Sequence, residues 1–550
     1  MPAATWRTRT RWALSTFYGP GWSVASLNRH SEKPPSLGGG GVTTTYRRKA
    51  AFLALCAAAV TTTLTGTAAT AATASSAPSS APASPPALAW ADCAHTGHLP
   101  GQQCAKLAVP LDYADPDGPQ VSLAVSRLPS TRPAARRGAL MVIPGGPGGS
   151  GVQRLSQKGT ALAGEMAGAY DLVALDPRGV GGSVTARCLT DEADRHLVTL
   201  RSWAGPDGGI EENTARSRRV AEACAANGGP ELRSFTTANQ ARDIDRFREA
   251  LGERKLSAWG VSYGAYVGAV YAQKFPQRTD RLVLDSSGDP DPTRVARGWL
   301  ANMARGAEDR FPDFAAWAAD PARDAEGLRL AEHPDDVRPL FLALAARLDR
   351  DPKPSDVPGV PLTGNVLRQA MQNSLYGDAF FPAFARLVRS AQDPAAVPAL
   401  PKELAGPLPD TDASLMVGVI CNDTAWPKDP AGYASAVAAD RAAHPLTAGM
   451  PANITPCAFW KDAPAERPTR ITDEGPKNIL MIQNLRDPAT PYSGALKMRA
   501  ALGSRARLLT VGHGGHGSYL GNGNPCADRT VTTYLTTGHR PARDTTCADG

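Results

Sequence analysis

Short runs of apolar residues recur along the chain, and within each run the apolar residues do not alternate with polar ones. Strands of this kind are buried on both faces of a sheet. Stretches with helical character separate several of them, such as residues 237–251, so the pattern predicts an α/β fold with a mostly parallel sheet. The expected strands are residues 107–113, 121–128, 138–143, 170–176, 256–259, 281–285, 478–482 and 506–511.

One of these strands leads into a G-x-S-x-G motif. Residues 256–259 precede Gly260-Val261-Ser262-Tyr263-Gly264, and residues 265–275 follow as an expected helix. A serine on a sharp strand-to-helix turn exposes its hydroxyl group, as a nucleophile requires. The flanking glycines keep side chains out of the tight turn. The motif has low specificity by itself, so a nucleophilic Ser262 needs partners elsewhere in the chain.

A glycine-rich loop, residues 144–151 (PGGPGGSG), follows the strand at 138–143. Such a loop lets a backbone N–H approach a substrate carbonyl, and the N–H of Tyr263 is the expected second oxyanion donor. The alternative is a phosphate-binding loop. The spacing G-x-x-x-x-G-K-[ST] and its lysine are both missing here, which disfavours that alternative.

Candidates for an acid and a base follow the last two strands. Asp487 lies in the loop after residues 478–482, although an Asp-Pro pair can also simply form a turn. His513 and His516 lie in a glycine-rich loop after residues 506–511. Two histidines could bind a metal, but no cysteine or carboxylate cluster accompanies them within the loop. The chain order Ser, Asp, His is that of α/β-hydrolases.

With these motifs the chain resembles the secreted tripeptidyl aminopeptidases of the α/β-hydrolase class, from about residue 90 to the end. The resemblance rests on residues 144–151, 176–183, 237–248 with Asp243 and Asp245, 260–264, 487–491 and 515–517. It implies that Ser262 is the nucleophile, Asp487 the orienting acid and His516 the base. The family's histidine is preceded by glycine and a variable residue, which fits His516, whereas His513 stands where a small residue is usual.

The resemblance also implies that Gly146 is the other oxyanion donor, as in the related prolyl iminopeptidases. Those enzymes usually have His-Gly-Gly-Pro, whereas Pro144 stands at the first position here. This departure leaves the backbone donor in place. Arg178, in the segment 176–183, is expected to brace neighbouring loops through bidentate hydrogen bonds and to have no catalytic role.

The function implied by the resemblance is that of an exported serine exopeptidase that releases tripeptides from free N-termini. A carboxylate would bind the substrate ammonium group, and Asp423, Glu308 and Asp309 are the candidates, although each could be an ordinary surface acid. No cofactor and no metal are expected. The alternatives are a secreted carboxylesterase with the same triad and a non-catalytic binding protein that retains the fold. The sequence does not set the residue preference, the length of the released peptide or the oligomeric state.

The chain divides into a leader, a linker and a hydrolase core with an insertion. Residues 1–41 are either a leader extension or untranslated, and residues 42–74 are the expected signal peptide. The signal has a basic start at 47–49, an apolar run at 50–60 that is too short to span a membrane, and cleavage sites at Ala71 and Ala74. Both Sec and Tat export remain open. Residues 75–89 are an expected disordered linker. The core comprises 90–289 and 471–550, and a helical cap comprises 290–470.

Charge and cysteine content agree with an exported globular protein. The net charge of +7 comes from the first 49 residues, which hold eight Lys or Arg and only Glu32 as an acid. From residue 50 onward basic and acidic residues balance, so nothing favours nucleic-acid binding. The eight cysteines after the leader favour disulfides over a metal site. Neighbour pairing is the simplest of the 105 connectivities: Cys93–Cys104, Cys188–Cys224, Cys421–Cys457 and Cys526–Cys547.

Overall fold

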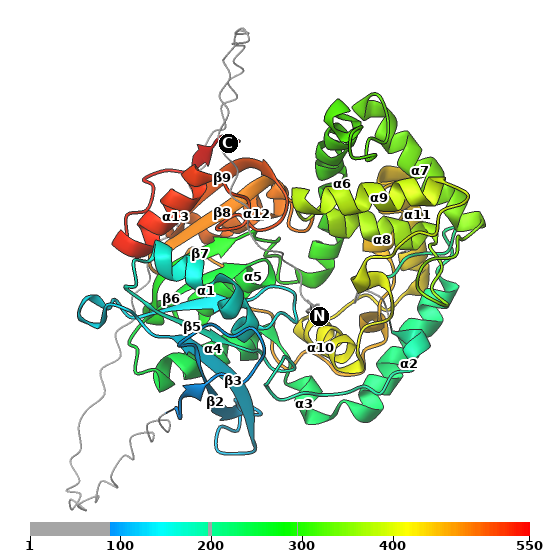
Figure 1. Ribbon diagram of the computed structural model, residues 1–550. Coiled ribbons are helices and arrows are strands. Elements are labelled where there is room, and N and C mark those ends of the chain that lie inside the picture. The colour runs from blue at the N-terminus through cyan, green and yellow to red at the C-terminus, as the bar shows by residue number, and fades with distance from the viewer. Residues whose placement is uncertain (1–87, 196–200, 294, 550) are drawn as a thin grey trace, which may run out of the picture. The chain divides into compact units, whose positions relative to one another are not determined.

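The computed structural model describes residues 88–195, 201–293 and 295–549, so the expected signal peptide and most of the linker lie outside the described residues. The described chain forms a ten-stranded sheet in the order β1-β2-β3-β5-β4-β6-β7-β8-β9-β10 (Figure 1). Strands β1, β2, β3 and β5 pair antiparallel, and every pair from β5 to β10 is parallel. The prediction of an α/β class with a mostly parallel sheet is therefore confirmed.

The strands are β1 (Ala91–Asp92), β2 (Gln103–Pro110), β3 (Gln120–Leu128), β4 (Ala139–Ile143), β5 (Asp171–Leu175), β6 (Leu256–Val261), β7 (Thr279–Asp285), β8 (Ile479–Arg486), β9 (Ala506–Gly514) and β10 (Thr545–Cys547). The helices of the core are α1 (Gly151–Glu165), α4 (Thr237–Ala250), α5 (Tyr263–Lys274), α12 (Tyr492–Leu502) and α13 (Pro525–Thr537). The other helices named below are α2 (Glu211–Asn227), α3 (Gly229–Arg233), α6 (Val295–Ala319), α7 (Pro334–Arg350), α8 (Gly364–Ser374), α9 (Phe381–Gln392), α10 (Asp410–Asp423) and α11 (Pro430–Ala443), with the 3-10 turns η5 (Asp378–Phe380), η7 (Met450–Ala452) and η8 (Pro456–Phe459).

Both faces of the central strands are buried, which explains why their sequences are apolar at successive positions. In β4, Leu140 and Val142 pack with residues of α1 and α13 on one face. Met141 and Ile143 pack with residues of α4, α5 and α12 on the other face. Because helices cover both faces of the central strands, the sheet has an apolar core on each side, as expected for parallel strands.

The chain between β7 and β8 is helical, and its helices share a separate core built around Phe311, Phe314, Phe341, Phe381 and Phe384. Figure 1 shows α6, α7, α8 and α9 gathered away from the sheet.

A second segment, between β5 and β6, joins these helices. Helix α2 packs against η8, and Ile210 lies in one apolar cluster with Tyr433 and Val437 of α11. We refer to the described residues of 186–235 and 290–470 together as the cap. The insertion predicted from the sequence, 290–470, does not include residues 186–235, and its limits stay a prediction.

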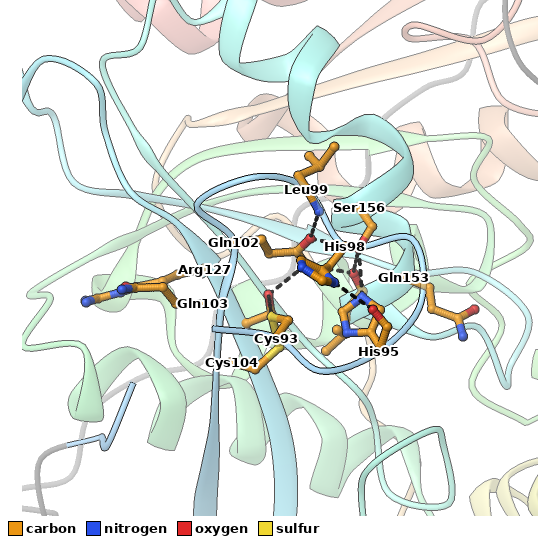
Figure 2. Close-up of a disulfide and its surroundings, with 12 residues drawn as sticks. Cys93, His95, His98, Leu99, Gln102, Gln103, Cys104, Arg127, Gln153 and Ser156 are labelled. Carbon is orange, nitrogen blue, oxygen red and sulfur yellow. Dashed lines mark hydrogen bonds between the residues drawn. A yellow bond between two sulfur atoms is a disulfide. The ribbon is translucent and has the colours of Figure 1, made fainter. Parts of the chain in front are cut away.

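All eight cysteines of the described chain form disulfides, in the neighbour pairing that the sequence predicted: Cys93–Cys104, Cys188–Cys224, Cys421–Cys457 and Cys526–Cys547. Figure 2 shows Cys93–Cys104 beside His95 and His98. A nitrogen of His95 lies within 4.8 Å of both sulfur atoms, but these sulfurs are bonded to each other rather than free to bind a metal. Of the helices in the described residues, none has the length and apolar character needed to cross a membrane.

Candidate active site

Ser262 occupies the turn between β6 and α5, where its backbone has φ 61° and ψ −125°. A non-glycine residue rarely adopts a positive φ, and such strain is typical of functional sites. The turn is held because the N–H of Ser262 donates to the carbonyl of Asp285 at 2.8 Å. Ser262 is partly exposed, whereas its neighbours Val261 and Tyr263 are buried. The strand-to-helix turn therefore presents a hydroxyl group to solvent from a rigid support.

Asp487 and His516 form a buried pair at the ends of β8 and β9. His516 Nδ1 lies 2.9 Å from each carboxylate oxygen of Asp487. Asp487 also accepts hydrogen bonds from the N–H groups of Ala489 and Thr490, both at 2.8 Å, and from the Thr490 hydroxyl at 2.9 Å. A carboxylate at Nδ1 fixes the tautomer with the proton on that nitrogen, which leaves Nε2 free to accept a proton. The pair can therefore act as an oriented base.

The structure brings Ser262 to the same edge of the sheet as this pair. The loop that follows His516 lies against the nucleophile strand, since a Cβ placed on Gly517 would be 3.8 Å from Val261 Cγ1. Within the described part of the chain no hydrogen bond joins Ser262 to His516, whose Nδ1 has Asp487 and Thr490 as its hydrogen-bond partners. Nucleophile–base hydrogen bonds are often long without substrate and tighten when it binds.

The glycine-rich loop after β4 contacts Ser262. A Cβ placed on Gly145 would be 3.1 Å from Ser262 Cβ. Gly146 has φ 120°, and a Cβ there would be 2.6 Å from the nitrogen of Gly148, so only glycine fits. Tyr263 is the first residue of α5, where N–H groups have no partner inside the helix. The N–H groups of Gly146 and Tyr263 thus belong to the two segments that flank Ser262.

A small cavity adjoins the glycine-rich loop. Its walls come from that loop, from the start of α5 and from the cap helix α10, and its lining is mainly apolar: Pro144, Gly145, Pro147, Gly148, Pro177, Arg178, Val180, Phe235, Thr236, Gln240, Tyr263, Leu415 and Val419. The Arg178 guanidinium donates to both carboxylate oxygens of Asp243, at 2.8 and 2.9 Å, and to the carbonyls of Pro110 and Leu111. The prediction that Arg178 braces neighbouring loops is confirmed.

The cap contacts both loops that carry the acid–base pair. The carbonyl of Tyr376, just after α8, accepts the N–H of His516 at 2.9 Å, and the two rings meet edge to face at 5.1 Å. A Cβ placed on Gly306 of α6 would be 2.5 Å from the carbonyl oxygen of Pro488, so the helix backbone lies directly on the acid loop. The cap is therefore part of the support of the site.

His513 lies apart from the acid–base pair in a cluster of charged groups. Its Nδ1 is 2.9 Å from Asp549, and its Nε2 is 4.0 Å from Asp378 of the cap. Arg486 pairs with Asp549 and with Asp313 of α6. The structure thus places His513 in β9 and His516 in the loop after it, with different surroundings, and of the two only His516 faces the carboxylate of Asp487.

The three acids considered for the substrate ammonium group all have partners. Glu308 pairs with Arg338 at 3.0 Å, and Asp309 pairs with Arg305 at 2.8 Å. Asp423, the last residue of α10, accepts the N–H of Thr237 at 2.8 Å and also its hydroxyl. The Thr237 hydroxyl in turn contacts the Tyr263 hydroxyl at 2.8 Å. Of the three, Asp423 lies on the helix that lines the cavity, one turn after Val419.

The half-buried position of Asp423 predicts a pH effect on stability. Burial raises the pKa of Asp423 to about 6 from an ordinary value of 3.8, although the two Thr237 donors oppose this shift. The folded state thus holds the proton more tightly than the unfolded state, and the resulting stabilisation is present below about pH 4 and lost as pH rises through about 6. We expect the unfolding free energy of the wild type to fall by about 2 kcal/mol relative to Asp423→Asn between pH 4 and 7.

Urea unfolding of both proteins at several pH values measures this difference. Asp309→Asn, which removes a carboxylate on the outer side of α6, is the matched control and should run parallel to the wild type. A constant difference between wild type and Asp423→Asn across the range would contradict the prediction.

Sequence reasoning missed several residues that support the site. Thr490 holds both oxygens of Asp487 in place, and the spacing D-x-x-T after a strand was a usable signal for such a capping turn. Asp285 and Ser286 bind the loop after His516, and Tyr376 binds His516 itself. These last contacts join residues that are far apart in the sequence, and no local pattern indicates them.

Known proteins resemble the chain over most of its length. The family model described as alpha/beta hydrolase fold matches residues 138–326, and the one described as TAP-like protein matches residues 444–547. The chain is 34% identical to the tripeptidyl aminopeptidase of Streptomyces lividans over 84% of this chain and 86% of that protein. It is 28% identical to serine protease Hip1 of Mycobacterium tuberculosis (83% and 90%) and 29% identical to a protein of the same species named carboxylesterase B (84% and 90%).

Proposed function

Since the chain belongs to the tripeptidyl aminopeptidase family of α/β-hydrolases, we propose that it is an exported serine exopeptidase that releases tripeptides from peptides with a free N-terminus. The observation that carries the proposal is the buried Asp487–His516 pair beside the strained Ser262 turn. The four disulfides support export to an oxidising compartment. Substrate peptides are the expected partners.

In the proposed reaction, Ser262 Oγ attacks the scissile carbonyl carbon while His516 Nε2 takes the hydroxyl proton. Asp487 stabilises the imidazolium that forms. The N–H groups of Gly146 and Tyr263 donate to the developing oxyanion, a contact that typically contributes a factor of about 100 or more to the rate. His516 then protonates the leaving amine as the C–N bond breaks. Water, activated by His516, hydrolyses the acyl-enzyme and restores Ser262.

Exopeptidase action requires recognition of the substrate ammonium group. Asp423 is the favoured acid because α10 also supplies Leu415 and Val419 to the cavity beside the nucleophile. Glu308 is the weaker candidate. Its carboxylate is bound by Arg338 and by the N–H of Leu446, both within the cap, and it does not line the cavity. A carboxylate in a confined site selects strongly for a cation because an unpaired buried charge is costly.

Hydrolysis of a matched set of substrates tests the proposal. The set is a tripeptide anilide with a free amine, its N-acetylated form, the corresponding dipeptide and tetrapeptide anilides, and a short-chain ester. We expect kcat/KM for the free tripeptide to exceed that for the acetylated form at least about 100-fold, because acetylation removes the charge that the site binds. Ser262→Ala controls for contaminating hydrolases and should be inactive on every substrate.

A carboxylesterase is the second candidate, favoured by the similarity to the protein named carboxylesterase B. Turnover of the ester alone, or faster turnover of the acetylated than of the free peptide, would reject the exopeptidase proposal in favour of this candidate. If a fluorophosphonate failed to label Ser262 in the folded protein, the chain would instead be a binding protein that retains the fold.

A further inference from the structure

Asp285 lies between the nucleophile strand and the acid strand. It is the last residue of β7, and its register partners are Val261 of β6 and Ile482 of β8. Its backbone carbonyl accepts the N–H of Ser262 at 2.8 Å. Its side chain is fully buried, and it is not part of the reaction described above. Asp285 is thus in direct contact with the backbone of Ser262.

The carboxylate of Asp285 binds the loop that follows His516. It accepts the N–H of Ser518 at 2.9 Å and the N–H of Tyr519 at 3.0 Å. The hydroxyl of Ser286, next in the chain, accepts the N–H of Gly517 at 2.9 Å and donates to Asp285 at 3.1 Å. Two adjacent residues therefore fix three successive N–H groups immediately after the base.

This loop needs external support because its own backbone is permissive. His516 stands between Gly515 and Gly517, which have φ 95° and 83°. Glycine adopts such angles without strain but also leaves them easily, so the flanking residues do not restrict the imidazole. On the preceding side the loop is held by Tyr376 and by the Asn484 side chain, which donates to the carbonyl of Gly515. On the following side Asp285 and Ser286 hold it.

A buried carboxylate at residue 285 is costly, which favours a specific role for Asp285 over simple packing in the core. Burial raises the pKa of Asp285, so a charged carboxyl is unfavourable at this position unless its donors compensate. Four donors do so: the N–H groups of Ser518 and Tyr519, the Ser286 hydroxyl and Trp259 Nε1 at 3.3 Å. An asparagine of the same size would turn an NH₂ group toward donors, and those contacts would be lost.

We propose that Asp285 is a positioning residue that sets the separation of Ser262 and His516, its carbonyl fixing the nucleophile and its carboxylate fixing the loop of the base. This inference rests on the proposed serine-hydrolase function. Its consequence is that Asp285 acts on the chemical step and not on substrate affinity, because it does not line the cavity between the glycine-rich loop and α10. Displacing a reacting group by about 1 Å can lower the rate about 100-fold.

The test compares Asp285→Asn and Ser286→Ala with Asp289→Asn. Asp289 is also buried, four residues further on, and its carboxylate pairs with Lys497 at 2.6 Å and with the N–H of Asp291, away from the histidine loop. We measure kcat and KM on the preferred peptide and the rate of Ser262 labelling by a fluorophosphonate, each per folded molecule as judged by near-UV circular dichroism.

For Asp285→Asn we expect kcat and the labelling rate to fall about 100-fold with KM unchanged, for Ser286→Ala a fall of about 10-fold, and for Asp289→Asn no change. Folded Asp285→Asn with wild-type kcat and labelling rate would overturn the inference. If Asp285→Asn does not fold, Ser286→Ala decides: slower labelling supports the inference and unchanged labelling overturns it. Absence of labelling in the wild type would instead refute the proposed function, so the two failures are distinguishable.

Discussion

Replacing His516 by alanine should lower kcat about 10⁵-fold, whereas His513→Ala should leave kcat within about threefold of the wild type. The reason is geometric. Only His516 has Nδ1 on the buried carboxylate of Asp487, so only its Nε2 is oriented to take a proton from the serine. His513 pairs with Asp549 at the edge of the cap.

The two variants are matched, because His513 at the end of β9 and His516 just after it lie three residues apart and lose the same imidazole group. Peptide hydrolysis under saturating substrate measures kcat, and urea unfolding checks that each variant is folded. His513→Ala should lose a little stability, since its ion pair is partly exposed and such pairs contribute about 1 kcal/mol or less. A large loss of kcat in folded His513→Ala, with activity retained in His516→Ala, would reverse the assignment of the base.

Gly260→Ala should abolish activity and destabilise the fold by at least about 3 kcal/mol. A Cβ at residue 260 would lie 2.2 Å from the carbonyl oxygen of Gly264 and 3.0 Å from the nitrogen of Ala265. Both obstacles are backbone atoms of the turn that carries Ser262, so relief requires the turn itself to move. Overpacking a rigid core typically costs about 1–3 kcal/mol, and backbone obstacles lie at the upper end or beyond.

The control for this prediction is Gly164→Ala, near the end of α1. Nothing lies within 4 Å of a Cβ at residue 164, and alanine is the better helix former by about 1 kcal/mol. Gly164→Ala should therefore be slightly stabilised and fully active. Thermal unfolding and peptide hydrolysis of the two variants provide the measurement. Gly260→Ala with wild-type stability and rate would show that the turn tolerates a side chain, against the geometry described above.

The centre of the fold could be predicted because each central strand is covered on both faces, which leaves a continuous apolar signature. The edge strands could not be predicted in this way. Strand β1 has two residues and β10 has three, and the Cys526–Cys547 disulfide joins β10 to α13. The positions of these two strands depend on contacts with the rest of the fold, and their sequences carry no apolar pattern that predicts a strand. The helices α2 and α3 were not predicted, because they pack against η8 and α10, which are distant in sequence.

The candidate site was predictable where the chemistry is local. A strand, a tight turn and a helix surround Ser262, and loops after the next strands carry Asp487 and His516; each pattern is visible within about ten residues. The orientation of His516 depends instead on Asp285, Ser286 and Tyr376, which only the folded chain brings together. Asp423 illustrates the reverse case, because the sequence singled out the residue and the structure supplied its contact with Thr237. Its role toward the substrate remains a prediction.

The contacts of the cap with both catalytic loops restrict how this enzyme can diversify. Tyr376 bonds the backbone of His516, and α6 rests on the carbonyl of Pro488. Grafting another recognition module between β7 and β8 would therefore also disturb the alignment of the reacting groups. A donor module would have to bring its own equivalents of these two contacts and a partner for α2. If α10 binds the substrate as proposed, point substitutions on α10 change the substrate preference with less disturbance of these contacts than exchange of the whole helical layer.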